Sequence, residues 1–166
     1  MNIVLRTVIL TVSDRASTGG YQDLSGPALV AALPNQFVIV ATRVIPDQPE
    51  AIRAALLEFA DGGQADLILT TGGTGFSDRD VTPEATRTVI ERPTPGLDET
   101  MRAASRASTP YAILSRATSG IRGRCLIVNL PGSPKGAVEC LEALLPALPH
   151  GLELLRGPVA DRQHQA

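Results

Sequence analysis

The sequence predicts a three-layer α/β/α domain, in which helices cover both faces of a mostly parallel β-sheet. Three observations support this fold class. Short apolar runs rich in Val, Ile and Leu alternate with longer amphipathic stretches, which is typical of strands joined by crossover helices. Aromatic residues make up only 3% of the chain, so the core must be aliphatic. The 166 residues, 43% of them hydrophobic, suffice for one domain with a sizeable core.

The composition narrows the class of protein and its location. Lys and Arg number 15 and Asp and Glu 17, and this balance gives no reason to expect binding to nucleic acid or to a membrane. The N-terminus lacks the pattern of a signal peptide, and no apolar run reaches transmembrane length. We therefore expect a cytoplasmic protein. Residues 1–166 are interpreted as one domain, with a core at about 5–155 and a C-terminal tail at 156–166.

The first two strands are expected at Leu5–Val12 and Phe37–Val44, where β-branched residues are frequent. A polar loop follows the first strand. The helix between the strands begins at Gly26-Pro27 and ends at Pro34-Asn35. Its apolar face consists of Leu29, Val30 and Leu33.

The next helix is expected to begin near Asp47, which stands three residues before Glu50 as in a capping box. It runs to about Ala60, and Asp61-Gly62-Gly63 ends it. The inward positions are Ile52, Leu56 and either Phe59 or Ala60.

A strand at Leu67–Thr70 leads into a glycine-rich bend and then into a helix at Glu84–Glu91. Thr82 can cap this helix, and Pro83 suits its first position. The bend matches neither the P-loop nor the dinucleotide fingerprint. Local chemistry leaves two alternatives at even odds, a phosphate-binding loop or a plain tight turn.

The C-terminal part continues the alternation. Expected elements are a helix from Leu97 to about Ala107, a short apolar run at Tyr111–Leu114, a turn at Ser119-Gly120 and a strand at Arg124–Leu130. Ser133 then caps a helix that has Pro134 at its first position. The apolar residues of this helix are Val138, Leu141, Leu144 and Leu145. Prolines at 146 and 149 interrupt it before a last helical piece to Leu155.

Polar clusters follow the apolar runs, and in a parallel sheet they would meet at one rim, where ligands bind. They are Ser13-Asp14-Arg15, Asp47, Thr71–Asp80, Ser115-Arg116 and Pro131–Lys135. Glycine amides, helix N-termini and Lys135 suit phosphate groups. Asp47 and Asp80 suit Mg²⁺, which takes one or two carboxylates.

Structural interpretations compete with these assignments. Asp47 alone is better explained as a helix cap, whereas Asp80 is evenly balanced. Asp14-Arg15 fits a local ion pair, and Lys135 fits a solvated side chain. Cys125 and Cys140 are expected to be buried structural thiols, and His150 and His164 surface residues, because neither pair has metal-ligand spacing.

Two segments resemble the signatures of the molybdenum-cofactor biosynthesis family, which includes bacterial molybdopterin adenylyltransferases and gephyrin G domains. The first is Thr70–Gly75 with Arg79–Thr86, and the second is Leu130–Gly136. Further matches are Ser13–Ser17, Tyr21–Asp23, Ile45–Asp47 and Ala112–Arg116, so the resemblance spans about Thr7 to Leu155. The segment from Glu142 to Gly151 is shorter than in some adenylyltransferases, and the chain also resembles shorter paralogues.

The resemblance implies a homotrimer that transfers AMP from Mg-ATP to molybdopterin and hands its product to a molybdenum-inserting enzyme. It places the two catalytic, Mg²⁺-binding aspartates at Asp47 and Asp80. It also implies binding of ATP or molybdopterin by Ser13, Asp14, Arg15, Thr71, Gly72, Gly73, Thr74, Gly75, Thr82, Ser115, Arg116, Pro131, Gly132, Ser133, Pro134 and Lys135. The alternatives are a non-catalytic molybdopterin-binding or carrier paralogue, which has less need of paired carboxylates, and a generic nucleotide-sugar or pyrophosphate enzyme, against which the second signature argues.

Overall fold

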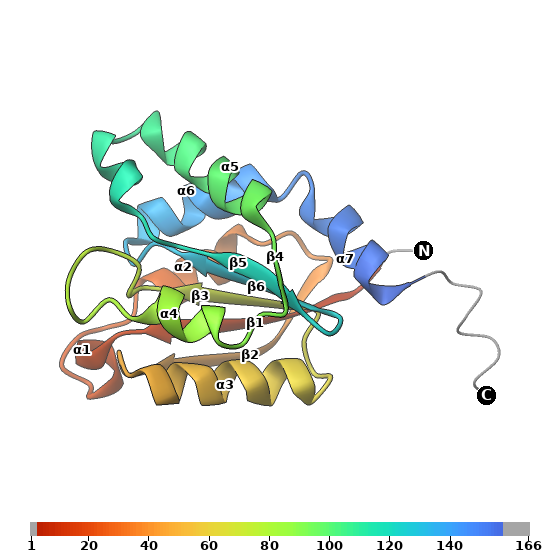
Figure 1. Ribbon diagram of the computed structural model, residues 1–166, viewed down its shortest axis with the longest axis horizontal. Coiled ribbons are helices and arrows are strands. Elements are labelled where there is room, and N and C mark those ends of the chain that lie inside the picture. The colour runs from red at the N-terminus through yellow and green to blue at the C-terminus, as the bar shows by residue number, and fades with distance from the viewer. Residues whose placement is uncertain (1–2, 158–166) are drawn as a thin grey trace.

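The structure, a computed structural model, describes residues 3–157 and contains one six-stranded sheet in the order β2-β1-β3-β6-β5-β4 (Figure 1). The strands are β1 (Leu5–Val12), β2 (Phe37–Ile45), β3 (Leu67–Thr71), β4 (Arg92–Pro93), β5 (Ser119–Arg122) and β6 (Cys125–Leu130). The pairs β1–β2, β1–β3 and β3–β6 are parallel, and β5 runs antiparallel to both of its neighbours. The predicted mostly parallel sheet is confirmed.

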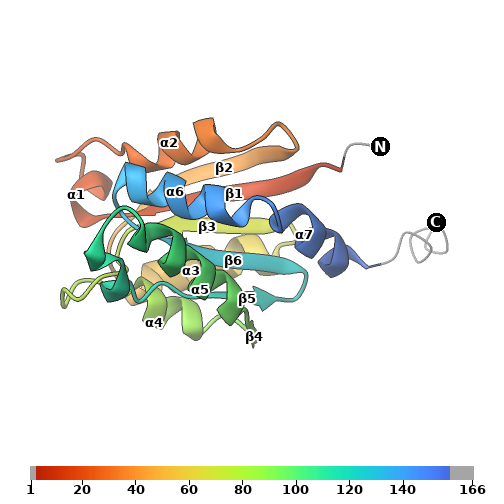
Figure 2. The same ribbon diagram turned by 90° about the horizontal axis from the view of Figure 1, so that it is seen from above.

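Helices cover both faces of this sheet. They are α1 (Asp14–Ser17), α2 (Ser25–Ala32), α3 (Pro49–Asp61), α4 (Thr82–Arg87), α5 (Pro95–Arg106), α6 (Pro134–Leu144) and α7 (Leu148–Arg156), with a 3-10 helix, η1, at Pro110–Leu114. Figures 1 and 2 show α3 and α4 on one face and α2, α5 and α6 on the other. Within residues 3–157, no helix is long and apolar enough to cross a membrane.

The strands feed two cores because their side chains alternate between the faces. Ile9, Leu69 and Val128 are neighbours in register and pack under α2, α5 and α6. Val8, Ile68 and Ile127 lie one residue earlier and pack under α3 and α4. Burial on both faces explains why these strands are continuous apolar runs.

Several expected helix faces need adjustment. Leu29 is fully buried, but Val30 is 38% exposed and lies outside the core that Leu29 joins. Phe59, not Ala60, completes the buried face of α3. In α6, Ala137 and Cys140 are buried with Leu141 and Leu144, whereas Val138 and Leu145 are only partly buried. Both cysteines are buried and free, as expected.

The apolar run Tyr111–Leu114 forms a 3-10 helix that Thr109 caps, and only Ala112 of that helix is buried. One prediction between this helix and β6 is wrong. Ser119-Gly120 is not a turn but part of β5, and the chain reverses at Gly123, which has φ +56. Glycine tolerates that backbone conformation, and Ser119 is buried in the sheet. Of the C-terminal tail expected at 156–166, Arg156 belongs to α7, and residues 158–166 lie outside the described residues.

A buried carboxylate ties the end of α7 to the start of the central strands. Asp66 accepts hydrogen bonds from the backbone N–H and the guanidinium of Arg6, and from Arg156 at the end of α7. Burial alone would raise the pKa of Asp66, but these donors lower it to about 2. Because the folded state favours the ionised form, Asp66 stabilises the fold at neutral pH.

We expect this stabilisation to disappear as the pH falls from about 4 to about 2, where Asp66 takes up a proton in both states. Asp66→Asn should lower the free energy of unfolding at pH 7 by about 2 kcal/mol and should flatten the loss of stability over that acid range. Urea denaturation at several pH values measures both effects. Asp78→Asn, which removes an exposed carboxylate on the loop between β3 and α4, is the control. An unchanged pH dependence in Asp66→Asn would contradict the assignment.

Candidate active site

The carboxyl ends of four parallel strands meet at one rim of the sheet. Ser13, after β1, donates its backbone N–H to the carbonyl of Ile45 at 2.9 Å. Gly72, after β3, donates to the carbonyl of Leu130 at 3.2 Å, and a Cβ built on Gly132 would lie 3.2 Å from Gly72 Cα. The loops that the sequence placed after separate strands are therefore in direct contact.

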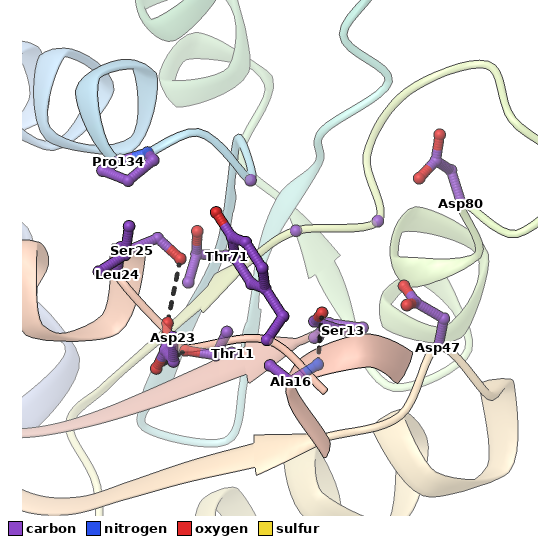
Figure 3. Close-up of a pocket in the computed structure, with 15 residues that line it drawn as sticks. Thr11, Ser13, Ala16, Asp23, Leu24, Ser25, Asp47, Thr71, Asp80 and Pro134 are labelled. Carbon is purple, nitrogen blue, oxygen red and sulfur yellow. Dashed lines mark hydrogen bonds between the residues drawn. The ribbon is translucent and has the colours of Figure 1, made fainter. Parts of the chain in front are cut away.

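A cavity of about 250 Å³ opens at this rim. Figure 3 shows Asp47 and Asp80 at one end of it, and Thr11, Asp23 and Ser25 at the other. The predicted site residues that line it are Ser13, Asp47, Thr71, Gly72, Gly73, Asp80, Gly132 and Pro134. The lining of the cavity thus combines the two carboxylates of Asp47 and Asp80 with the backbone of Gly72, Gly73 and Gly132.

Asp47 is held by the loop after β1 and not by its own helix. Its Oδ2 atom accepts the backbone N–H of Asp14 at 2.8 Å, and its own N–H donates to Asp14 Oδ1 at 2.9 Å. Gln48 is the N-cap of α3, and no side chain caps that helix end. The interpretation of Asp47 as a helix cap is thus wrong, because its carboxylate is turned toward the loop after β1 across the rim.

The two carboxylates of the cavity affect each other. Burial, and then the nearby negative charge of Asp80, raises the pKa of Asp47. Asp80 is fixed in a tight turn, in which its Oδ2 atom accepts the N–H of Ser77 at 2.9 Å. An oxygen-preferring divalent cation between these carboxylates would relieve their repulsion.

The glycine bend brings bare backbone up to these groups. Gly72 and Gly73 have φ +106 and +67, which favour glycine, and a Cβ on Gly72 would overlap the carbonyl oxygen of Val12. A Cβ on Gly73 would overlap the hydroxyl of Thr82 and lie 3.1 Å from Asp47 Oδ1. Thr82 does not cap α4 as expected, because its hydroxyl donates to the Gly72 carbonyl at 3.0 Å, and Val81 is the N-cap.

A buried polar network, which was not predicted from the sequence, connects α4 to the strands β3 and β6. The Asn129 amide donates to the hydroxyls of Thr70 at 3.0 Å and Thr86 at 2.9 Å, and its oxygen accepts the N–H of Thr118. All four residues are buried. An asparagine inside the most apolar strand was the available signal, because a buried amide needs partners.

Arg116 holds the loop that leads to Asp80. Its backbone N–H donates to the Thr74 carbonyl at 2.9 Å, and its guanidinium donates to the carbonyls of Gly75 at 2.7 Å and Asp80 at 2.6 Å. The same guanidinium pairs with Glu84. These donors bind groups of the protein itself, so Arg116 stabilises the conformation of the loop.

A second cavity, of about 340 Å³, lies on the other side of the glycine bend. The predicted site residues that line it are Thr74, Gly75, Ser115, Pro131 and Ser133. Successive residues of the bend thus border different cavities, and so do alternate residues of Pro131–Pro134. These two segments form the wall between the cavities.

Five predicted site residues line neither of these two cavities: Asp14, Arg15, Thr82, Arg116 and Lys135. Lys135 has an 81% exposed side chain and lies 3.8 Å from Glu139. Arg15 stacks on the ring of Tyr21 at 4.8 Å, so Asp14-Arg15 is not an ion pair; Asp14 pairs with Arg79 instead. Ser133 caps α6 as predicted, accepting the N–H of Gly136 at 3.1 Å.

The far end of the first cavity contains further polar residues that were not assigned from sequence. Asp23 accepts the Thr11 hydroxyl at 2.8 Å and the N–H of Gly26 at 3.0 Å. Tyr21 also lines this end. Within residues 3–157, no group of three or more His, Cys, Asp or Glu side chains is arranged to hold a metal ion.

Comparison with known proteins adds a family and several relatives. The family described as "Probable molybdopterin binding domain" matches residues 8–150. A molybdopterin adenylyltransferase of Helicobacter pylori strain J99 is 45% identical over 153 residues, which cover 90% of this chain and 86% of that protein. One from Escherichia coli K12 is 43% identical over 173 residues, covering 95% and 88%.

A solved structure agrees with both the sequence match and the fold. The molybdopterin biosynthesis enzyme MoaB from Thermus thermophilus superimposes with a TM-score of 0.88 at 50% identity. The match covers 93% of this chain and 98% of that one. The similarity therefore extends over nearly the whole domain.

The carboxylate pair should cost the folded protein stability. A raised pKa means that ionised Asp47 is less favourable in the folded than in the unfolded state, so removing its charge should help at neutral pH. We expect Asp47→Asn to raise the melting temperature at pH 7, since an amide oxygen can still accept the Asp14 N–H. Asp61→Asn, whose carboxyl has a lowered pKa beside Arg122, should lower it. Calorimetry measures both melting temperatures, and a lower value for Asp47→Asn than for the wild type would contradict the raised pKa of Asp47.

Proposed function

The chain belongs to the molybdopterin-binding domain family, and on that premise we propose that it is a molybdopterin adenylyltransferase. It transfers AMP from ATP to molybdopterin and releases pyrophosphate. The observation that carries the proposal is that Asp47 and Asp80 share one cavity beside a glycine bend. A protein that only carries molybdopterin needs a pocket, but it has no need of two carboxylates that repel each other.

The reaction needs two anionic substrates brought together at one phosphorus atom. An oxygen of the terminal phosphate of molybdopterin attacks the α-phosphorus of ATP in line. The new O–P bond forms as the bond to the β-phosphate oxygen breaks, and pyrophosphate leaves with that electron pair. Catalysis of this kind depends mainly on position and charge.

The two cavities provide a binding position for each of the two substrates. We assign one substrate to each, because they are separate spaces on either side of a thin wall. That wall is the Gly72–Gly75 bend together with Pro131–Pro134. Backbone N–H groups of the bend can approach the phosphates closely, since no Cβ stands in the way at its glycines. The reacting phosphates therefore meet at the bend.

The carboxylates supply the charge arrangement. Asp47 and Asp80 fit Mg²⁺, which binds through one or two carboxylates and keeps the rest of its ligands from water and phosphate. Magnesium supplies neutralisation of the triphosphate when bound. Around it, Asp14 orients Asp47 through two backbone–carboxylate hydrogen bonds, and the Ser77–Asp80 turn orients Asp80.

We also propose that the enzyme works in the cytoplasm as a homotrimer and passes its product to a molybdenum-inserting enzyme. Support for self-association comes from exposed valines on the edge strand β2 and on α2. They are Val30, Val38, Val40 and Val44. Exposed apolar side chains on an edge strand are often covered by another chain. Light scattering of the purified protein would measure the mass of the assembly.

Adenylyl transfer should depend on Asp80. Purified protein, molybdopterin, Mg²⁺ and ATP should yield adenylylated pterin and pyrophosphate, which chromatography detects. Asp80→Ala should lower kcat about a hundredfold or more while molybdopterin still binds, because it removes a carboxylate of the first cavity, where we place Mg-ATP, and leaves the second cavity unchanged.

Asp78→Ala is the matched control, since Asp78 is an exposed carboxylate on the same loop. It should retain activity. Equal turnover by Asp80→Ala and wild type would refute the role of Asp80. Pterin binding by the wild type with no product would favour a carrier.

A further inference from the structure

An arginine outside the predicted site reaches across the rim to the residue that holds Asp47. Arg79 lies on the loop between β3 and α4, and its Nη2 atom donates to Asp14 Oδ2. The other oxygen of Asp14 accepts the N–H of Asp47 at 2.9 Å. Figure 1 shows this loop at the same end of the sheet as α1. Asp14 thus connects the guanidinium of Arg79 to the backbone of Asp47, which is one of the two carboxylate residues.

The loop is built so that Arg79 is placed together with Asp80. The N–H of Asp80 donates to the Ser77 carbonyl at 2.9 Å, and the N–H of Arg79 donates to the Ser77 hydroxyl at 3.3 Å. With the Ser77 N–H bound to Asp80 Oδ2, these contacts close a compact turn. A ligand that engages Asp80 therefore finds the backbone of Arg79 beside it.

Arg79 makes fewer bonds to the protein than Arg116 and, unlike Arg15, does not lie over an aromatic ring. Its side chain is 71% exposed and pairs with one carboxylate, Asp14. By contrast, Arg116 is bound to two carbonyls of the loop and to Glu84. Arg15 lies over Tyr21. An exposed ion pair contributes little stability, so Arg79 can leave Asp14 at small cost.

The negative charge around the cavity favours a move of Arg79 from Asp14 to a bound phosphate. Asp23, Asp47 and Asp80 line the cavity and Asp14 contacts Asp47, so four carboxylates surround a site that must accept a triphosphate. A guanidinium binds phosphate through two parallel N–H donors, and such bonds are stronger than neutral ones. Phosphate oxygens are thus a stronger attraction for Arg79 than the single Asp14 oxygen that it contacts here.

We propose that Arg79 exchanges Asp14 for the β- and γ-phosphates of ATP and stabilises pyrophosphate as it leaves. The inference rests on the proposed function. When the bond between the α-phosphorus and the bridging oxygen breaks, the electron pair stays on that oxygen, and the N–H groups of Arg79 donate to the growing charge without proton transfer. Arg79 is then a contact for the leaving group, distinct from Asp47 and Asp80.

Binding of Mg-ATP and Mg-AMP, measured by calorimetry without molybdopterin, tests this contact, because AMP lacks the two outer phosphates. Arg79→Ala should weaken ATP binding about tenfold or more and AMP binding by less than about twofold. Arg79→Lys keeps the charge but not the planar fork, so its ATP affinity should fall between the two. Arg43→Ala, which removes another exposed arginine that pairs with Glu58 and lines neither of the two cavities that we assign to the substrates, should change neither.

Asp14→Asn distinguishes a phosphate contact from a purely structural ion pair. It breaks the Arg79–Asp14 pair and leaves the guanidinium in place, while its amide oxygen can still accept the N–H of Asp47. ATP binding by this variant should be as tight as that of the wild type or tighter. Equal weakening of ATP and AMP by Arg79→Ala, or weakening of ATP by Asp14→Asn to the same extent, would overturn the proposal in favour of a structural role. A wild type that binds neither nucleotide would instead refute the proposed adenylyltransferase.

Discussion

The site depends on one steric constraint, the absence of a side chain at Gly73. At this point the bend passes between the hydroxyl of Thr82 and the carboxylate of Asp47, with no room for a Cβ. Thr82 fixes the bend in turn, through its hydroxyl bond to the Gly72 carbonyl and its N–H bond to the Gly73 carbonyl. The start of α4, the bend and the end of β2 are thereby held in one arrangement.

Support for this arrangement comes from polar groups placed where a core would normally be apolar. Asn129 links β3, β6 and α4 beneath the bend, and Arg116 links the bend to the loop above it. A fully satisfied buried network specifies one geometry, whereas apolar packing alone tolerates small shifts. The domain thus combines an aliphatic sheet with a rigid polar rim, and the carboxylate repulsion at that rim is stability given up for function.

The fold was predictable because each strand carries its own signal. The run Leu5–Val12 matches β1 in both bounds, and β3 and β6 differ by one residue. Prediction failed at Ser119-Gly120, because β5 depends on its hydrogen bonds to β4 and β6. The apolar run Tyr111–Leu114 forms a 3-10 helix whose start is marked locally by Thr109 and Pro110. The convergence of the rim loops followed from parallel strands alone.

The site was predictable in its residues but not in its partners. Capping-box spacing indicated that Asp47 would bond α3, yet its oxygen bonds Asp14, which is 33 residues earlier in the chain. Likewise, Asp14 and Arg15 are adjacent in sequence, but the cation that reaches Asp14 is Arg79, 65 residues away. A local pattern shows only the nearby partner of a side chain. The distant partner that competes with it comes close only when the strand ends meet in the folded protein. The polar residues of a sheet rim are therefore best interpreted as a set, and their individual roles follow from which loops the sheet brings together.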